Sequence, residues 1–189
     1  MSDLFRTSLG EHRALFERLV GLEAEIERAA ALIAGALGGG RKLMLCGNGG
    51  SAADSQHIAA ELTGRFIKDR RPLAAMALTT DTSALTCIAN DYSYEEVFAR
   101  QVTALGLRGD CLIGISTSGN SKNVIRAAEA ARETGMHIIG LLGRDGGALL
   151  RLCDVPIVVP SVVTARIQEA HIFIGHTLCG LVESALGVA

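Results

Sequence analysis

The sequence has no tryptophan, only three prolines and no pair of cysteines in a CxxC spacing. Its five cysteines are scattered and lie mostly inside apolar runs. This pattern favours reduced core thiols over disulfides or a thiolate zinc site. No run of about 18 apolar residues occurs, and the N-terminus lacks the apolar stretch of a signal peptide. These absences predict a cytoplasmic protein without a membrane-spanning helix.

A dominant charge is also missing, because 18 basic residues stand against 20 acidic ones and no basic cluster occurs. We therefore expect no nucleic-acid partner. Apolar material is abundant, at 49% of the residues, which is enough for a substantial core. The length of 189 residues and the lack of a linker rich in proline, serine or charge predict a single domain over 1–189.

Apolar residues from Leu15 to Leu37 are spaced three, four or seven apart, which predicts a long helix within 1–37 that stops at the glycines 38–40. Further along, short apolar runs alternate with helical patterns. The predicted strands are 43–46, 73–78, 111–115, 137–142 and 155–159, and the predicted helices are 52–66, 83–89, 94–105, 123–134 and 164–186. Continuous apolar strands alternating with helices predict a doubly wound α/β domain, a parallel sheet with helices on both faces.

Two polar loops follow predicted strands, GNGGS at 47–51 and STSGNS at 116–121, and both lead into predicted helices. Glycines let the backbone approach an anion closely, and hydroxyls and helix N-terminal amides then bind it. Neither loop matches the GxGxxG or P-loop pattern, which disfavours dinucleotides and triphosphates. Alternatively, Ser51 and Ser121 only cap the helices. Because both loops lie beyond strand ends, we favour phosphate binding.

Histidine and carboxylate side chains are spaced as in a metal site. His57 and Glu61 lie one turn apart on one helix face, where both can bind a single ion. Gln168 and His176 share the last predicted helix, about 12 Å apart along its axis and about 80° around it. The spacing alone does not establish a metal site, since His57 can be structural and the pair His57/Glu61 can be solvated.

Four segments together resemble the bacterial phosphoheptose isomerases, enzymes of the sugar isomerase (SIS) domain superfamily. These segments are CGNGGSAADSQHIAAELTGRF, IANDYSYEEVFARQV, GDCLIGISTSGNSKNVIRAAEAA and ARIQEAHIFIGH. The resemblance covers nearly the whole chain. It implies a flavodoxin-like or Rossmann-like SIS fold and conversion of sedoheptulose 7-phosphate to D-glycero-D-manno-heptose 7-phosphate. That reaction is the first step of ADP-/GDP-heptose precursor synthesis for lipopolysaccharide core or other surface glycans.

The resemblance also implies a set of site residues. It implies one zinc ion per subunit at His57, Glu61, Gln168 and His176, with Glu61 and His176 catalytic. It implies substrate contacts at Asn48, Gly49, Gly50, Glu61, Asn90, Asp91, Ser116, Thr117, Ser118, Ser121 and Gln168, to which we add Ser51 at the end of the first loop. Finally, it implies a homotetramer with active sites at subunit interfaces, and we expect the helix within 1–37 to take part in that packing.

Three alternatives stay open. A non-catalytic SIS protein that binds the bacterial replication initiator resembles much of this sequence, but it lacks the full glutamate and second histidine set that Glu61 and His176 provide here. Other SIS isomerases act on arabinose 5-phosphate or a hexose phosphate, and the arabinose enzymes usually add C-terminal regulatory domains. A SIS-type sugar-phosphate sensor would bind without chemistry.

Overall fold

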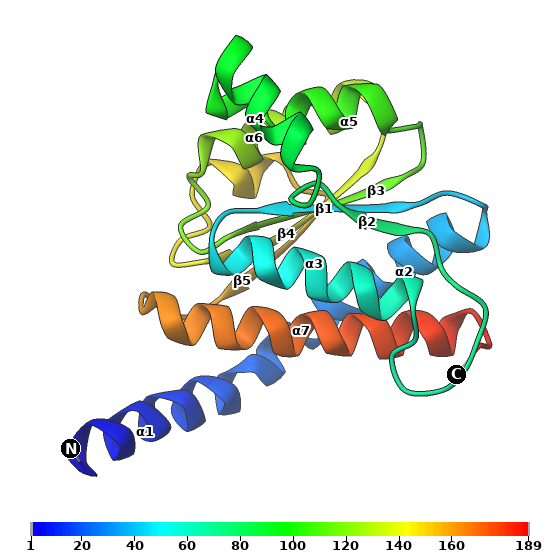
Figure 1. Cartoon of the computed structure of the whole chain (residues 1–189). Coiled ribbons are helices and arrows are strands. Elements are labelled where there is room, and N and C mark those ends of the chain that lie inside the picture. Colours follow the sequence, from blue (N-terminus) through cyan, green and yellow to red (C-terminus); the bar gives the residue numbers. More distant parts are fainter. Residues whose placement is uncertain (1, 189) are drawn as a thin grey trace.

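Five parallel strands form one sheet in the computed structural model, which describes residues 2–188 (Figure 1). They are β1 (Leu43–Gly47), β2 (Ala75–Ala77), β3 (Cys111–Ser116), β4 (His137–Gly143) and β5 (Val155–Val159). The strand order is β2-β1-β3-β4-β5, so the chain winds outward from β1 in two opposite directions. The predicted doubly wound sheet is confirmed. In folds of this order, ligands bind where the direction reverses, between β1 and β3.

Helices cover both faces of the sheet (Figure 1). Side chains alternate along each strand, so Leu43 and Leu45 face one core while Met44 and Cys46 face the other. The first face carries α2 (Glu23–Gly38), α3 (Gly50–Thr63) and α7 (Thr164–Ala185), and the second carries α5 (Ala99–Leu105) and α6 (Lys122–Thr134). This layering puts α3 and α7 side by side on one face.

The predicted long N-terminal helix is confirmed, and a short 3₁₀ turn interrupts it. Helix α1 (Ser2–Arg18) begins earlier than the apolar pattern indicated and projects from the body (Figure 1). A 3₁₀ turn (Leu19–Leu22) then separates it from α2, which packs on the sheet. Gly21 is a poor helix former, and Leu22 leaves helical geometry with a ψ of 5°. The break changes the direction of the chain at the edge of the core.

Other boundaries differ by a few residues. Helix α3 ends at Thr63 instead of 66, because Gly64 leaves the helix while its N–H still bonds to the Ala60 carbonyl. The segment predicted as one helix over 94–105 consists of a 3₁₀ turn (Tyr94–Glu96) followed by α5. Helix α4 (Thr82–Asp91) matches its predicted position, whereas the 3₁₀ turn Ala148–Leu152 was not predicted. None of the helices between residues 2 and 188 combines the length and apolarity needed to cross a membrane.

His171 anchors α7 to the sheet. Its side chain is fully buried, and its Nε2 lies 3.0 Å from the Leu142 carbonyl of β4. Burial lowers the pKa of this imidazole to about 4, although the hydrogen bond to Leu142 opposes the shift. The ring is therefore neutral at physiological pH and serves as a structural donor.

This buried imidazole predicts a pH dependence of stability. An unfolded histidine titrates near a pKa of about 6.5, so below that pH the unfolded chain binds the proton that the folded chain refuses. His171 therefore stabilises the fold fully above about pH 6.5 and loses this contribution as the pH falls toward 4. Urea unfolding should show that wild type loses about 2 kcal/mol more than His171→Gln between about pH 7 and 5. Equal losses in the two proteins would contradict this assignment.

Candidate functional site

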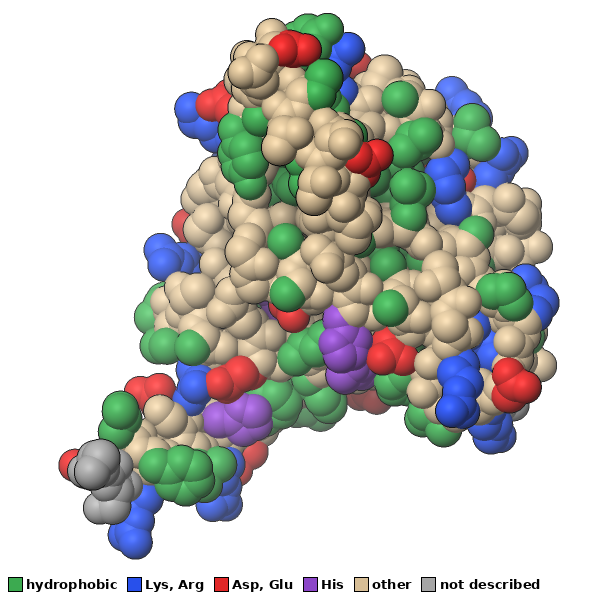
Figure 2. Space-filling model, viewed as in Figure 1, with side chains coloured by type: hydrophobic (Ala, Val, Ile, Leu, Met, Phe, Trp, Pro, Cys, Tyr) green, Lys and Arg blue, Asp and Glu red, His purple; other side chains and the backbone are tan. Residues whose placement is uncertain are grey.

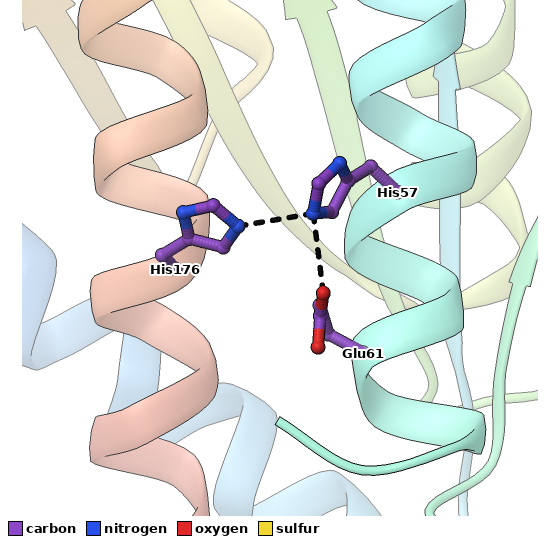
Figure 3. A group of neighbouring side chains, drawn as sticks. All are labelled: His57, Glu61 and His176. Atoms are coloured by element: carbon purple, nitrogen blue, oxygen red, sulfur yellow. Dashed lines mark hydrogen bonds and ion pairs between the residues drawn. The ribbon is translucent and has the colours of Figure 1, made fainter. Parts of the chain in front are cut away.

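Three donor side chains meet between α3 and α7 (Figure 3). His57 Nε2 lies 3.0 Å from His176 Nε2 and 3.1 Å from Glu61 Oε1. His57 and Glu61 are one turn apart on α3, and His176 reaches them from α7. The structure thus brings together three of the four residues proposed as metal ligands, although 115 positions separate Glu61 from His176 in the sequence.

Close packing of the two helices sets this separation. A Cβ atom at Gly175 would lie 2.5 Å from Ile58 Cδ1, so a larger residue there would force the Ile58 side chain to move. Gly175 and Ile58 are the immediate neighbours of His176 and His57, so the contact acts directly at the cluster. The Phe66 ring also stacks on the His176 imidazole, with centroids 5.6 Å apart.

The donor chemistry fits a divalent cation. His57 Nε2 faces both His176 Nε2 and Glu61 Oε1, but it carries only one proton or one lone pair. It therefore cannot form a full hydrogen bond with both of them. A cation satisfies all three atoms at once. Ligands bound at about 2.0–2.1 Å in a tetrahedron are roughly 3.3 Å apart, close to the separations found here. The His57 side chain is 49% exposed and Glu61 is 24% exposed, so an ion and a further ligand have access.

Two titratable groups near the cluster are shifted by burial. Burial raises the pKa of the Cys179 thiol to about 12, and the carboxylates of Glu61 and Glu183 add to the shift. This protonated thiol is a poor ligand, which leaves nitrogen and oxygen donors. On the other side, burial raises the pKa of the Asp54 carboxyl, and the neighbouring His57 opposes the rise.

Gln168 lies about two turns before His176 on α7, and its amide packs against Gly50. A side chain at position 50 would collide with that amide. Gln168 therefore connects the last helix to the first polar loop, while the cluster in Figure 3 consists of the other three residues.

The first polar loop leaves β1 beside the second, because β1 pairs with β3 up to Gly47 and Ile115. Gly49 has φ 55° and ψ −120°, a conformation that favours glycine. Asn48 exchanges two amide hydrogen bonds with Asn123, of 2.9 and 2.8 Å. The Tyr94 hydroxyl donates to Asn48 Oδ1 at 3.0 Å. These contacts fix the loop at the reversal point of the sheet.

The second loop is held by its own hydroxyls and by the turn after β4. Ser116 Oγ and Ser121 Oγ lie 3.0 Å apart. Gly119 has a φ of 65°, and a side chain there would collide with the Gly146 carbonyl. The Asn120 amide donates to the Ser118 carbonyl and accepts from the Ala148 N–H, each at 3.0 Å. The loop is thus preformed.

The alternative in which Ser51 and Ser121 cap the helices is wrong for Ser51, whereas Ser121 occupies the N-cap position of α6 but makes no side-chain cap hydrogen bond. The residue preceding α3 is Gly49, and no side chain caps that helix. Ser121 precedes α6, yet its hydroxyl bonds to Ser116 and not to a helix amide. The N-termini of α3 and α6 therefore keep amide groups without side-chain partners at the reversal point, as an anion site requires.

Asn90 and Asp91 are not joined to either loop by a hydrogen bond among the described residues. The Asn90 amide donates to Asp91 Oδ1 at 2.8 Å, which lowers the pKa of that carboxyl together with the Cys87 thiol. Both lie at the exposed end of α4, a helix without buried residues. Sequence reasoning missed Asn123 and Tyr94, because an asparagine in a helix and a tyrosine in a turn form no recognisable pattern.

Comparison with known proteins identifies the family to which this fold belongs. The SIS domain model matches residues 9–143. The chain is 56% identical to the phosphoheptose isomerase of Nitratiruptor sp. over 186 residues, which cover 98% of this chain and 100% of that protein. It is 52% identical to the phosphoheptose isomerase of Rhodospirillum rubrum over 98% of this chain and 99% of that one. It is also similar to the structure of phosphoheptose isomerase GmhA from Neisseria gonorrhoeae, with a TM-score of 0.92, 48% identity and coverage of 97% and 98%.

The parallel sheet and its two polar loops thus define a member of the SIS domain family. Within that family, the chain belongs to the phosphoheptose isomerases and is an isomerase enzyme. The resemblance found in the four sequence segments is confirmed, and enzyme activity is favoured over the non-catalytic alternatives.

The Gly175–Ile58 contact predicts a sharp difference between two glycines of α7. Gly175→Ala should destabilise the chain by about 1–3 kcal/mol through overpacking against Ile58, and it should weaken the binding of a divalent cation at the cluster roughly tenfold. Gly180→Ala is the matched control, since its Cβ would meet Phe66 at an ordinary 3.6 Å. Urea unfolding and Zn²⁺ competition with a coloured chelator measure both effects. Equal stability and equal metal affinity in the two variants would show that the contact between Gly175 and Ile58 does not determine the geometry of the site.

Proposed function

We propose that this enzyme converts sedoheptulose 7-phosphate to D-glycero-D-manno-heptose 7-phosphate by metal-assisted proton transfer. The observation that carries the proposal is the convergence of His57, Glu61 and His176 from two helices, beside a fold with two preformed anion loops. The names of the relatives support a phosphorylated heptose as the substrate. An open-chain ketose and its aldose differ only in which of two neighbouring carbons carries the carbonyl.

We propose zinc as the metal, held by His57, Glu61 and His176, with Gln168 as a further ligand from α7. Imidazole and carboxylate donors at these separations suit zinc. The chemistry that a bound zinc ion supplies is Lewis-acid stabilisation of negative charge on the substrate oxygens. Gln168 would need to turn from Gly50 toward the cluster to complete the set.

Glu61 is the proposed base. It takes a proton from C1, an enediol forms, and the proton returns at C2. One carboxylate oxygen faces His57, which leaves the other for proton transfer. His176 carries a proton from the hydroxyl oxygen on C1 to the oxygen on C2, so that the carbonyl ends on C1. Its imidazole is oriented for this work by the Phe66 ring.

The two loops are proposed to hold the phosphate and the adjoining hydroxyls, away from the reacting carbons. Ser116, Thr117, Ser118 and Ser121 offer hydroxyls, and Asn48 to Ser51 offer backbone amides at the start of α3. Binding energy at this remote end positions the reacting end. Asn90 and Asp91 stay predicted substrate contacts, and their exposure on α4 suits an interface site.

We further propose a homotetramer with interfacial active sites. The projecting helix α1 carries hydrophobic side chains on its surface (Figure 2), among them Leu4, Phe5 and Leu9. A shallow apolar groove next to it is lined by Phe16, Val20, Phe173 and Leu181. Single chains rarely expose such patches without a partner, and packing of copies would cover both features. The activity would serve heptose precursor synthesis for surface glycans in the cytoplasm.

The decisive test follows product formation from sedoheptulose 7-phosphate by NMR. Wild type should form the aldose, and a chelator should stop turnover until Zn²⁺ is restored. Glu61→Gln should lower kcat by roughly 10²–10⁴-fold with unchanged unfolding, since the isosteric amide cannot accept the proton. Glu129→Gln, which changes a surface glutamate on α6, is the matched control. An unchanged substrate in the wild-type sample, or a wild-type rate in Glu61→Gln, would reject the proposal.

A further inference from the structure

A buried ion pair joins Arg70 to Glu183 near the candidate metal centre, and neither residue is among the predicted site residues. Arg70 stands in the segment between α3 and β2, and its side chain is 2% exposed. Its Nε lies 2.6 Å from Oε1 of Glu183, which is on α7 and 3% exposed. The pair therefore ties the segment after α3 to α7, the two helices that form the cluster.

The rest of the Arg70 guanidinium caps α3. One terminal nitrogen donates to the Glu61 carbonyl at 2.7 Å, and the other donates to the Leu62 and Gly64 carbonyls at 2.8 and 2.9 Å. The last carbonyls of a helix have no partners within it, and they attract a cation. Arg70 therefore fixes the backbone of Glu61 itself while it is bound to α7.

Glu183 is connected to the other side of the cluster. It follows His176 by seven residues, so both lie on the same face of α7, about 10 Å apart. Its Oε1 also accepts from the Phe66 N–H at 3.3 Å, and the Phe66 ring stacks on the His176 imidazole. The ion pair is thus linked to Glu61 through the backbone and to His176 through Phe66.

Stability alone does not account for this arrangement. A well-packed apolar pair commonly replaces a buried ion pair without loss of stability. An apolar pair cannot hold two carbonyls of α3, the Gly64 carbonyl that follows them and one carboxylate of α7 in a fixed relation. The planar guanidinium, with five N–H donors, does so.

We propose that the Arg70–Glu183 pair is a positioning clamp that sets the separation of His57 and Glu61 on α3 from His176 on α7. This inference rests on the proposed function for its consequence in catalysis, although the geometry that it sets exists without metal. Arg70 and Glu183 are positioning residues, since both are buried below the cluster and act through Glu61 and Phe66.

The test uses the double variant Arg70→Met/Glu183→Leu, which removes both charges and keeps apolar volume. Apo protein is titrated with Co²⁺, whose visible absorption reports the coordination geometry. We expect the double variant to bind Co²⁺ roughly 10- to 100-fold more weakly with an altered spectrum. We expect kcat to fall more than KM rises, because the phosphate loops are untouched. Arg70→Lys keeps the charge with fewer donors and should be intermediate.

A second readout needs no metal. The ¹⁵N chemical shifts of the His57 and His176 imidazoles in metal-free protein report their contact, and His137, exposed at the start of β4, serves as the reference. In the double variant the ¹⁵N shifts of His57 and His176 should change, and those of His137 should stay the same. If the double variant keeps both the imidazole shifts and the wild-type Co²⁺ affinity, the clamp is rejected.

Another ion pair provides the matched control for stability. Lys42 Nζ lies 2.5 Å from Asp110 Oδ2 where β1 and β3 begin, at the end of these strands opposite to the two polar loops. Asp110→Asn should lower the unfolding temperature yet leave the Co²⁺ affinity and spectrum unchanged. An equal loss of affinity in this control would show that metal binding follows overall stability, which overturns the clamp. Failure of wild type to isomerise sedoheptulose 7-phosphate would instead reject the proposed function, and the imidazole shifts would still decide on the clamp.

Discussion

The close approach of α3 and α7 is the constraint on which the site depends. Each helix alone carries an incomplete set of donors, His57 and Glu61 on one and His176 on the other. The packing of the two helices, at a contact where a side chain at Gly175 would force Ile58 to move, brings these donors into one cluster. Because interiors are close-packed and shift little, a contact of this kind fixes donor positions more firmly than surface interactions can.

The sheet supplies the second half of the arrangement. Its strand order reverses between β1 and β3, so the two polar loops emerge side by side and lead into helices without side-chain caps. One of those helices is α3, whose N-terminus lies at the loops and whose third and fourth turns carry His57 and Glu61. A single helix therefore connects the proposed phosphate end of the site to the reacting end, and Gln168 contacts the same loop from α7.

The sequence predicted the elements well because buried parallel strands and amphipathic helices have distinct apolar patterns. The sequence also predicted the positions of the two polar loops, because clusters of glycine and serine directly after apolar strands are typical of such loops. It could not predict that His176 meets His57, because helix spacing describes only one helix at a time. The 3₁₀ turn at Leu19–Leu22 and the role of Arg70 were not predicted from the sequence for the same reason, because both depend on packing against distant residues. The assignment of the site residues came from family resemblance and stays a prediction.

X-ray absorption spectroscopy of the zinc-loaded enzyme tests the central claim most directly, because it reports the ligand atoms without reference to activity. We expect a shell of nitrogen and oxygen ligands at about 2.0–2.1 Å with the outer-shell scattering of two imidazoles. For His176→Ala we expect the scattering of one imidazole. Sulfur at about 2.3 Å, or a wild-type spectrum with fewer than two imidazoles, would contradict the proposal that His57, Glu61 and His176 hold one metal ion.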